Sequence, residues 1–325
     1  MEPNMPYNEQ GTMLRMRSIL FPTDFSPCAE RAYTHAVHLA RRLGAKLHVL
    51  SVVYHEDDAE TSPMSFLPLG SDELAAQLGL ESSTLPGGDD SLEVINAQLQ
   101  STSAWRTIVD YVDDHKIDLV VMGTHGRHGL DRLLLGSVAE QVVRRAPCPV
   151  LTVRQEHPMP RRPGAIPEIV VPVDFSPFSR PTLKYAVDLA RHYGAKLALV
   201  HVVEQVNLPN VYGIDPIPVV APDLQARSLQ ALEALATDEI PPSQPFDCTV
   251  LIGHAGHDIV EFADDRDADM IVIATHGLTG LKRLLMGSVT EQVVRAAACP
   301  VFTVRSFESA ETATRPQTED RYEVH

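Results

Sequence analysis

The strongest constraint on the fold of this chain is an internal repeat. The segment FPTDFSPCAERAYTHAVHLARRLGAKLHVL at 21–50 returns as VPVDFSPFSRPTLKYAVDLARHYGAKLALV at 171–200, an offset of 150 residues. The offset then grows by one, and an ungapped alignment of 118–154 with 269–305 has 25 identities in 37 positions. Because 325 residues are enough for two ordinary domains, the repeat predicts two copies of one domain.

Each copy alternates strand patterns with helix patterns. Short, continuous apolar runs rich in β-branched residues are typical of parallel strands that are buried on both faces. Their alternation with helices predicts an α/β fold: two tandem doubly wound domains, each with a mostly parallel five-stranded sheet flanked by helices. The expected strands are 18–21, 47–53, 93–99, 119–122 and 149–153 in the first copy, and 169–173, 197–203, 247–252, 270–273 and 300–304 in the second.

Helix ends are marked by capping residues. Ser26 is expected to cap the first helix, with Pro27 at the first helical position and Gly44 at the C-cap. Further helices are expected at 103–115 and 256–266. The second copy repeats the caps of its first helix at Ser176, Pro177 and Gly194.

The two copies diverge most at 54–92 and 204–222, which are rich in loop-forming residues. The apolar terminal strands would leave exposed edges if each copy stood alone, so we expect the copies to pack as an intramolecular pseudo-dimer. A homodimer of whole chains stays open. The expected organisation is a flexible N-terminus at 1–16, a first domain at 17–154, a linker at 155–167, a second domain at 168–305 and a flexible tail at 306–325.

Composition argues against several classes of partner. The formal net charge of −16 repels phosphate backbones and anionic membrane surfaces, so we expect no nucleic-acid partner. No segment resembles a signal peptide or a membrane helix. Four widely spaced cysteines form no C-x-x-C pair, which favours a reduced, cytoplasmic location.

Candidate site residues follow the strands of the first copy. Asp24 ends the first strand, Gly123 and Gly126 follow a later one, and Gly136-Ser137 comes nine residues after Gly126. Ligands of open parallel sheets bind at the carboxyl ends of strands. Ser137 to Glu140 matches the S-x-x-E capping box, which predicts a helix start whose backbone N–H groups face an anion.

This arrangement predicts a nucleotide site. Asp24 would accept hydrogen bonds from ribose hydroxyls, and the glycines and the helix start would accommodate phosphates. Each feature also has a purely structural interpretation: the glycines allow a tight turn, Ser137 caps a helix, and Asp24 holds a loop. The combination in this order favours the nucleotide interpretation.

These residues resemble the universal stress proteins, in their tandem, two-domain form. The family signature G-x-x-G, nine residues, G-[S/T] matches Gly123, Gly126, Gly136 and Ser137, and P-x-D-F-S matches residues 22–26 and 172–176. The resemblance implies ATP as the ligand, with the end of the second strand against the adenine. The implied nucleotide-binding residues are Pro22, Thr23, Asp24, Val52, Met122, Gly123, Gly126, Gly136, Ser137 and Val138, and, in the second copy, Pro172, Val173, Asp174, Val202, Ile273, Ala274, Gly277, Gly287, Ser288 and Val289.

The second copy departs from the signature, because Ala274 replaces its first glycine. The added methyl group would weaken binding if the backbone there approaches the nucleotide closely. Alanine would be tolerated if the residue has a negative φ. Because only the first copy keeps this glycine, we expect the two sites to be unequal, with the first site the tighter.

The expected function is a cytoplasmic ATP-binding stress-response protein, acting as a nucleotide-dependent binding or regulatory module. The alternative is a slow ATPase or nucleotidyl-transfer enzyme on the same scaffold. P-loop, α/β-hydrolase and ATP-pyrophosphatase motifs are missing, and no catalytic residue is assigned; His125 and His276 lie in the glycine loops but suit a structural role better. Mg²⁺ would bind through the nucleotide phosphates rather than through protein ligands. Cys28, His35 and His38 make a poor zinc set because a fourth ligand is missing.

Overall fold

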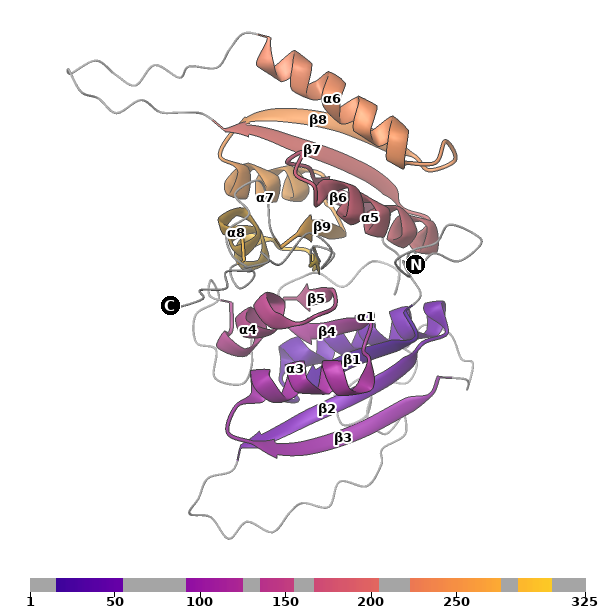
Figure 1. Cartoon of the computed structure of the whole chain (residues 1–325), viewed down its shortest axis with the longest axis vertical. Coiled ribbons are helices and arrows are strands. Elements are labelled where there is room, and N and C mark those ends of the chain that lie inside the picture. Colours follow the sequence, from indigo (N-terminus) through magenta and orange to yellow (C-terminus); the bar gives the residue numbers. More distant parts are fainter. Residues whose placement is uncertain are drawn as a thin grey trace, which may run out of the picture.

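The computed structural model describes residues 16–54, 92–124, 135–154, 167–204, 223–275 and 286–305. The fold is α/β with a mostly parallel sheet and flanking helices, as predicted (Figure 1). The first repeat contains β1 (Ser18–Thr23), α1 (Pro27–Leu43), β2 (Lys46–Tyr54), β3 (Val94–Ser101), α3 (Ala104–His115), β4 (Leu119–Gly123), α4 (Ser137–Arg145) and β5 (Val150–Val153). The second contains β6 (Glu168–Pro172), α5 (Ser179–Tyr193), β7 (Lys196–Glu204), α6 (Leu224–Glu239), β8 (Phe246–Gly253), α7 (Ala255–Asp265), β9 (Met270–Ala274), α8 (Ser288–Ala296) and β10 (Val301–Val304).

All ten strands belong to one continuous sheet, in the order β3-β2-β1-β4-β5-β10-β9-β6-β7-β8. Strands within each repeat pair in parallel. The chain therefore runs outward from β1 through β2 to β3, and then returns to the other side of β1 for β4 and β5. This reversal places a topological switch point between β1 and β4, and a second one between β6 and β9.

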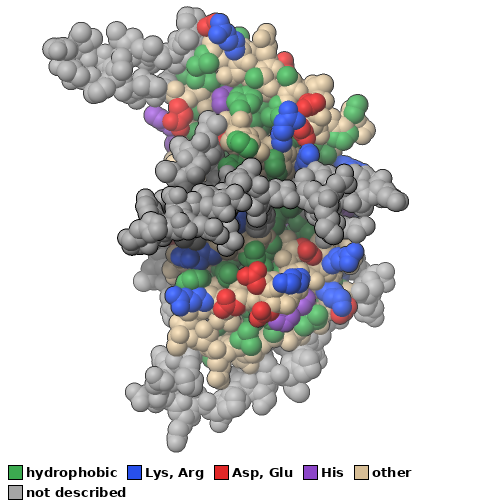
Figure 2. Space-filling view, viewed as in Figure 1, with side chains coloured by type: hydrophobic (Ala, Val, Ile, Leu, Met, Phe, Trp, Pro, Cys, Tyr) green, Lys and Arg blue, Asp and Glu red, His purple; other side chains and the backbone are tan. Residues whose placement is uncertain are grey.

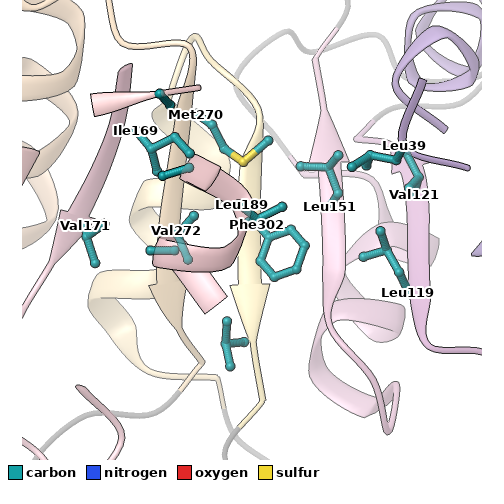
Figure 3. Packing of buried hydrophobic residues seen from close by; sticks show 14 of the residues in the cluster. Leu39, Leu119, Val121, Leu151, Ile169, Val171, Leu189, Met270, Val272 and Phe302 are labelled. Atoms are coloured by element: carbon teal, nitrogen blue, oxygen red, sulfur yellow. The ribbon is translucent and has the colours of Figure 1, made fainter. Parts of the chain in front are cut away.

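The two repeats meet where β5 pairs antiparallel with β10. Two threonines reinforce the junction, since Thr152 Oγ1 donates to Val301 O at 3.2 Å and Thr303 Oγ1 donates to Val150 O at 3.0 Å. Leu151 and Phe302 are register partners, and Figure 3 shows them on neighbouring strands. Both side chains are fully buried, so the junction is a continuation of the hydrophobic core.

Helices cover both faces of the sheet. The core on one face packs under α1, α5 and α6, and includes Tyr33 and Leu189. The core on the other face packs under α3, α4, α7 and α8, and includes Val142 and Val293. Both cores draw residues from both repeats, so each hydrophobic layer passes across the junction.

The second repeat differs from the sequence prediction at the start of α5. Ser176 is not the N-cap, because α5 begins at Ser179 after a short turn in which Ser179 N donates to Ser176 O at 3.0 Å. Pro181 explains the shift. Proline has no N–H and cannot complete a helical bond to Pro177, whereas in the first turn of a later helix no such bond is needed. In the first repeat the prediction is confirmed: Ser26 caps α1 through Ala29 N.

One helix was not predicted. Helix α6 covers the edge of the second repeat, in a segment where the sequence patterns predict no element. Its buried residues are Ser228, Leu232 and Ala236, a narrow and weakly apolar stripe. Leu229, Leu232 and Ala236 have the helical spacing that would have identified it.

All four cysteines are free. Burial raises the pKa of Cys148 and of Cys299 to about 12, and that of Cys248 to about 11. These three thiols are therefore poor nucleophiles at neutral pH. In the part of the chain that the structure describes, no helix has the length and apolarity needed to cross a membrane. Acidic and basic side chains are interspersed on the face shown in Figure 2.

Candidate functional site

The predicted site residues gather at the carboxyl edge of the sheet, at the two switch points. In the first repeat β1 lies between β2 and β4, with Thr23 paired to Ser51 and Leu20 paired to Val120. The ends of these three parallel strands therefore lie side by side, which brings the loop after Thr23 close to Gly123. The second repeat has the same order around β6.

The loop after β1 is held by its own side chains. Asp24 is exposed, and its Oδ1 accepts a hydrogen bond from Ser26 N at 3.1 Å. Thr23 Oγ1 accepts from Phe25 N at 3.0 Å, and Phe25 itself has a left-handed φ of 59°. These bonds fix the carboxylate of Asp24 at the edge of the sheet.

The second repeat holds Asp174 differently. Its Oδ1 accepts from Ser176 N at 3.0 Å and also from the hydroxyl of Ser179 at 2.8 Å. The ring of the neighbouring Phe175 lies 4.7 Å from that of His201. The corresponding positions of the first repeat are Ala29 and Ser51, which offer neither contact. The hydroxyl of Ser179 thus gives Asp174 a bond that Ala29 cannot provide in the first repeat.

The start of α4 is tied to the end of β4. Gly136 N donates to Thr124 O at 2.8 Å, and Thr124 N donates to Val153 O at 2.9 Å. The same bonds recur in the second repeat, from Gly287 N to Thr275 O at 2.8 Å and from Thr275 N to Val304 O at 2.9 Å. Each helix start is therefore anchored beside its switch point. Gly126, Gly277, His125 and His276 lie outside the described residues.

The predicted capping boxes do not form. Gly136 and Gly287 occupy the N-cap positions, neither helix has a side-chain cap, and Ser137 and Ser288 are the first helical residues. The first intrahelical bond of α4 is from Glu140 N to Gly136 O, so the N–H groups of residues 137–139 precede the helical ladder. The glutamates of the two motifs form ion pairs with arginines instead of reaching back to the caps. The prediction of a helix start was correct, but its capping mechanism was wrong.

The glycines of the signature serve different purposes. A Cβ on Gly123 would lie 2.8 Å from Cys28 Sγ and 3.1 and 3.2 Å from backbone atoms of Cys28 and Ala29. A side chain at 123 would therefore force the start of α1 to shift. In contrast, Gly287 has a φ of −60°, and the nearest described atom to a Cβ there would be Thr275 O, at 3.4 Å. The described part of the chain therefore places no demand for glycine at 287.

The remaining predicted residues line the same edge at different depths. Met122 and Ile273 are buried in the core, whereas Val52 and Val138 are half-buried. Sequence reasoning missed Cys28, whose thiol donates to Val153 O at 3.2 Å beneath the site. It also missed Thr290, whose hydroxyl donates to Ala274 O at 2.7 Å. Pro22, Val173 and Val202 are buried, and Pro172 and Val289 are half-buried.

The residues considered for metal binding are not gathered at the site edge. Cys28 is buried under the site, whereas His38 stacks on Tyr193 with ring centroids 5.3 Å apart. Burial lowers the pKa of His38. His257, Asp258 and Glu261 on α7 bring potential ligand atoms within 4.8 Å of one another, but the His257 and Glu261 side chains are about two-thirds exposed.

Comparison with known proteins identifies relatives along both repeats. The model of the universal stress protein family matches residues 16–154 and 166–305. Universal stress protein Rv2005c of Mycobacterium tuberculosis is 32% identical over 220 residues, which cover 67% of this chain and 71% of that protein. Universal stress protein Slr1230 of Synechocystis is 25% identical over 313 residues, covering 89% of this chain and 100% of that protein.

Solved structures show the same fold. A crystal structure of a universal stress protein from Pseudomonas aeruginosa has a TM-score of 0.63 at 20% identity, and covers 90% of this chain and 94% of that one. A universal stress protein from Archaeoglobus fulgidus has a TM-score of 0.59 at 17% identity, and covers 90% of this chain and 99% of that one.

Proposed function

Because the chain belongs to the universal stress protein family, we propose that it is a cytoplasmic stress-response protein that binds ATP at the switch point of each repeat. The observation that carries the proposal is the convergence of two features at each of these points: a carboxylate, and a helix start anchored to a strand end. Ligands of open α/β sheets bind at this position.

Each feature fits one part of a nucleotide. The carboxylates of Asp24 and Asp174 accept hydrogen bonds from ribose hydroxyls. The N–H groups at the starts of α4 and α8, together with the positive ends of the helix dipoles, receive the phosphates. Val52 and Val202, near the ends of β2 and β7, lie against the adenine. Mg²⁺ binds through phosphate oxygens and water.

Gly287 gives separate support. Neither its φ nor its contacts with the described residues require a glycine, so the missing side chain is free to serve the close approach of an anion to the helix start. Gly136 has the same ordinary backbone, with a φ of −59°. A phosphate that approaches the backbone at these positions explains why a side chain would be unfavourable there.

We propose a binding and regulatory role rather than catalysis. Among the described residues, the site edge carries Asp24 or Asp174 in hydrogen bonds to its own loop, an arrangement that suits ligand binding better than activation of water. Nucleotide occupancy would then bias the conformations of the protein by differential affinity. Slow hydrolysis of ATP is the competing outcome of the experiment below.

The proposal includes an intramolecular pseudo-dimer. The pairing of β5 with β10 supports it, because this pairing gives each terminal strand a partner inside the chain. The net charge of −16 supports a protein that does not bind nucleic acids or anionic membranes.

The test begins with native mass spectrometry of the purified chain, which identifies any co-purified small molecule by mass. Titration calorimetry with ATP then measures affinity in the wild type, in Gly136→Val, in Gly287→Val and in the double variant. We expect each single variant to lose one site and the double variant to lose both. Ala231→Val, on the exposed face of α6, is the control. Unchanged ATP binding in a folded double variant would refute the site, and stoichiometric release of phosphate on incubation would favour the ATPase alternative.

A further inference from the structure

Helices α4 and α8 each connect a proposed nucleotide site with the opposite repeat. Each begins at a site, at Gly136 or Gly287, and the two helices lie on either side of the junction between the repeats (Figure 1). At the middle and at the C-terminal end of each helix, side chains make contacts with the opposite repeat.

Four side chains join the middles of the two helices. We define the junction network as Glu140 and Arg144 of α4 with Glu291 and Arg295 of α8. Within each helix the pair is close, at 2.9 Å in α4 and 2.8 Å in α8. Across the junction, Arg144 Nη2 lies 3.3 Å from Glu291 Oε2, and Arg295 Nη2 lies 3.6 Å from Glu140 Oε2.

The network is partly sheltered from water. The four side chains are between 21% and 36% exposed, so salt screens them less than it screens ordinary surface pairs. Each arginine contacts both glutamates, and a shift of one helix therefore changes the contacts of the other.

Each of the two helices is capped at its C-terminal end by an arginine of the opposite repeat. Arg154 of the first repeat donates to Arg295 O at 2.7 Å, near the end of α8. Arg305 of the second repeat donates to Arg145 O at 2.7 Å and to Ala146 O at 3.0 Å, at the end of α4. A guanidinium at a helix C-terminus satisfies carbonyl groups and complements the helix dipole.

These caps are directly connected to the sites. Gly136 N bonds to Thr124 O, Thr124 N bonds to Val153 O, and the next residue is Arg154, the cap of α8. The second repeat follows the same route from Gly287 through Thr275 and Val304 to Arg305, the cap of α4. The two routes and the two helices form a closed circuit of bonds through both sites.

We propose that the two sites bind nucleotide with positive cooperativity, transmitted by this circuit. The inference rests on the proposed function. A nucleotide that holds the start of α4 restricts the motion of α4 and thereby orders its contacts with α8. The second nucleotide then meets a helix that is already ordered, and loses less conformational entropy on binding.

Calorimetry measures the coupling between the sites. The single-site variants Gly136→Val and Gly287→Val give the association constant of each isolated site for ATP, and the wild type gives the product of its two stepwise association constants. We define the coupling factor as the wild-type product divided by the product of the two isolated constants, and expect it to be about five- to 150-fold, the usual range of allosteric coupling. The variant Glu140→Gln/Glu291→Gln, which keeps side-chain size, should reduce the factor, because it removes the ion pairs between the middles of the two helices while the arginine caps remain.

The control removes the same charge from each repeat at exposed positions outside the circuit, with Asp110→Asn and Glu233→Gln. Its coupling factor should equal that of the wild type. A factor of one or less in the wild type, with ATP bound at both sites, overturns the inference and leaves the proposed function standing. Absence of ATP binding at both sites rejects the two together.

Hydrogen exchange gives a second measurement that does not depend on the network variants. In Gly287→Val only the first site binds ATP, and we expect the amides of α8 to exchange more slowly when ATP is added. Protection of α4 with no change in α8 overturns the inference, because it shows that the ordering stops at the junction.

Discussion

The two repeats place the same site edge on differently packed first helices. In the first repeat, α1 starts at Pro27, and its first turn presses against Gly123 at distances that exclude a Cβ. In the second repeat, Ala274 replaces that glycine, and α5 starts at Ser179, one residue beyond the counterpart of Cys28. The later helix start and the added methyl group occur together.

This difference changes the interpretation of the signature. The first glycine of the motif is required by helix packing in the first repeat, so its replacement in the second is not evidence for a damaged ligand site. The helix starts at Gly136 and Gly287, in contrast, have nearly identical φ and ψ and the same anchoring bond. The helix starts are therefore the part of the proposed site that the two repeats share most closely.

The largest expected effect concerns the junction, where the two repeats contribute unequal side chains. Phe302→Ala removes a fully buried aromatic ring and should destabilise the chain by about 3 to 5 kcal/mol. Leu151→Ala, its register partner, should cost about 2 to 5 kcal/mol. Urea unfolding followed by circular dichroism measures both. If Phe302→Ala costs less than 1 kcal/mol, the junction is not part of the core.

The next effect tests the packing of Gly123. Gly123→Ala should destabilise the protein by about 1 to 3 kcal/mol, because the new Cβ meets the thiol and the backbone of α1. Cys28→Ala in the same chain should restore only part of the loss, since it removes the contact with Sγ but not the contacts with backbone atoms. Urea midpoints of the two variants and of Cys28→Ala alone give the comparison. A neutral Gly123→Ala would show that α1 yields at no cost.

Much of this architecture follows from local sequence patterns. The strands were predictable because parallel strands buried on both faces are continuous apolar runs, and the site edge followed from the rule on strand ends. Helix α6 was missed because only a narrow stripe of it is buried. Ser176 followed by proline is a typical N-cap pattern and predicts an earlier start for α5. The later start depends on Pro181, which lacks the N–H that a helix beginning at Pro177 would need. The exchanged caps of Arg154 and Arg305 link residues 141 to 160 positions apart, and no local pattern reports such contacts.

A smaller effect is expected from pH. Asp269 Oδ2 accepts from Glu168 N at 3.1 Å, and burial is the main cause that raises the pKa of Asp269 to about 6. The folded state therefore binds this proton more tightly than the unfolded state, and the group stabilises the fold as pH falls from about 7 towards 4. Asp269→Asn should remove this contribution while keeping an acceptor for Glu168 N.

The measurement is the unfolding free energy in urea at pH 7.5 and at pH 5, for Asp269→Asn and the wild type. Asp118→Asn is the matched variant, because Asp118 Oδ2 accepts from Arg17 N at 2.7 Å and Ser18 N at 3.0 Å at the same place in the first repeat. We expect the wild type to gain more stability at pH 5 than Asp269→Asn does. An equal gain in both would assign the pH dependence to other groups.

The smallest effect is expected from Ala274→Gly, and it decides whether the two sites differ at the first position of the signature. If the methyl group of Ala274 faced the nucleotide, its removal would tighten the second site by about five- to 150-fold, as relief of an overpacked contact does. The packing of Gly123 against α1 points to the other result, because the corresponding atoms in the second repeat belong to the start of α5 rather than to a ligand. We therefore expect Ala274→Gly to change ATP affinity by less than about threefold, about 0.7 kcal/mol. Calorimetry in the Gly136→Val background isolates the second site for this measurement. Tighter binding by a factor of ten or more would show that the added methyl group, and with it the departure from the signature, weakens the second site.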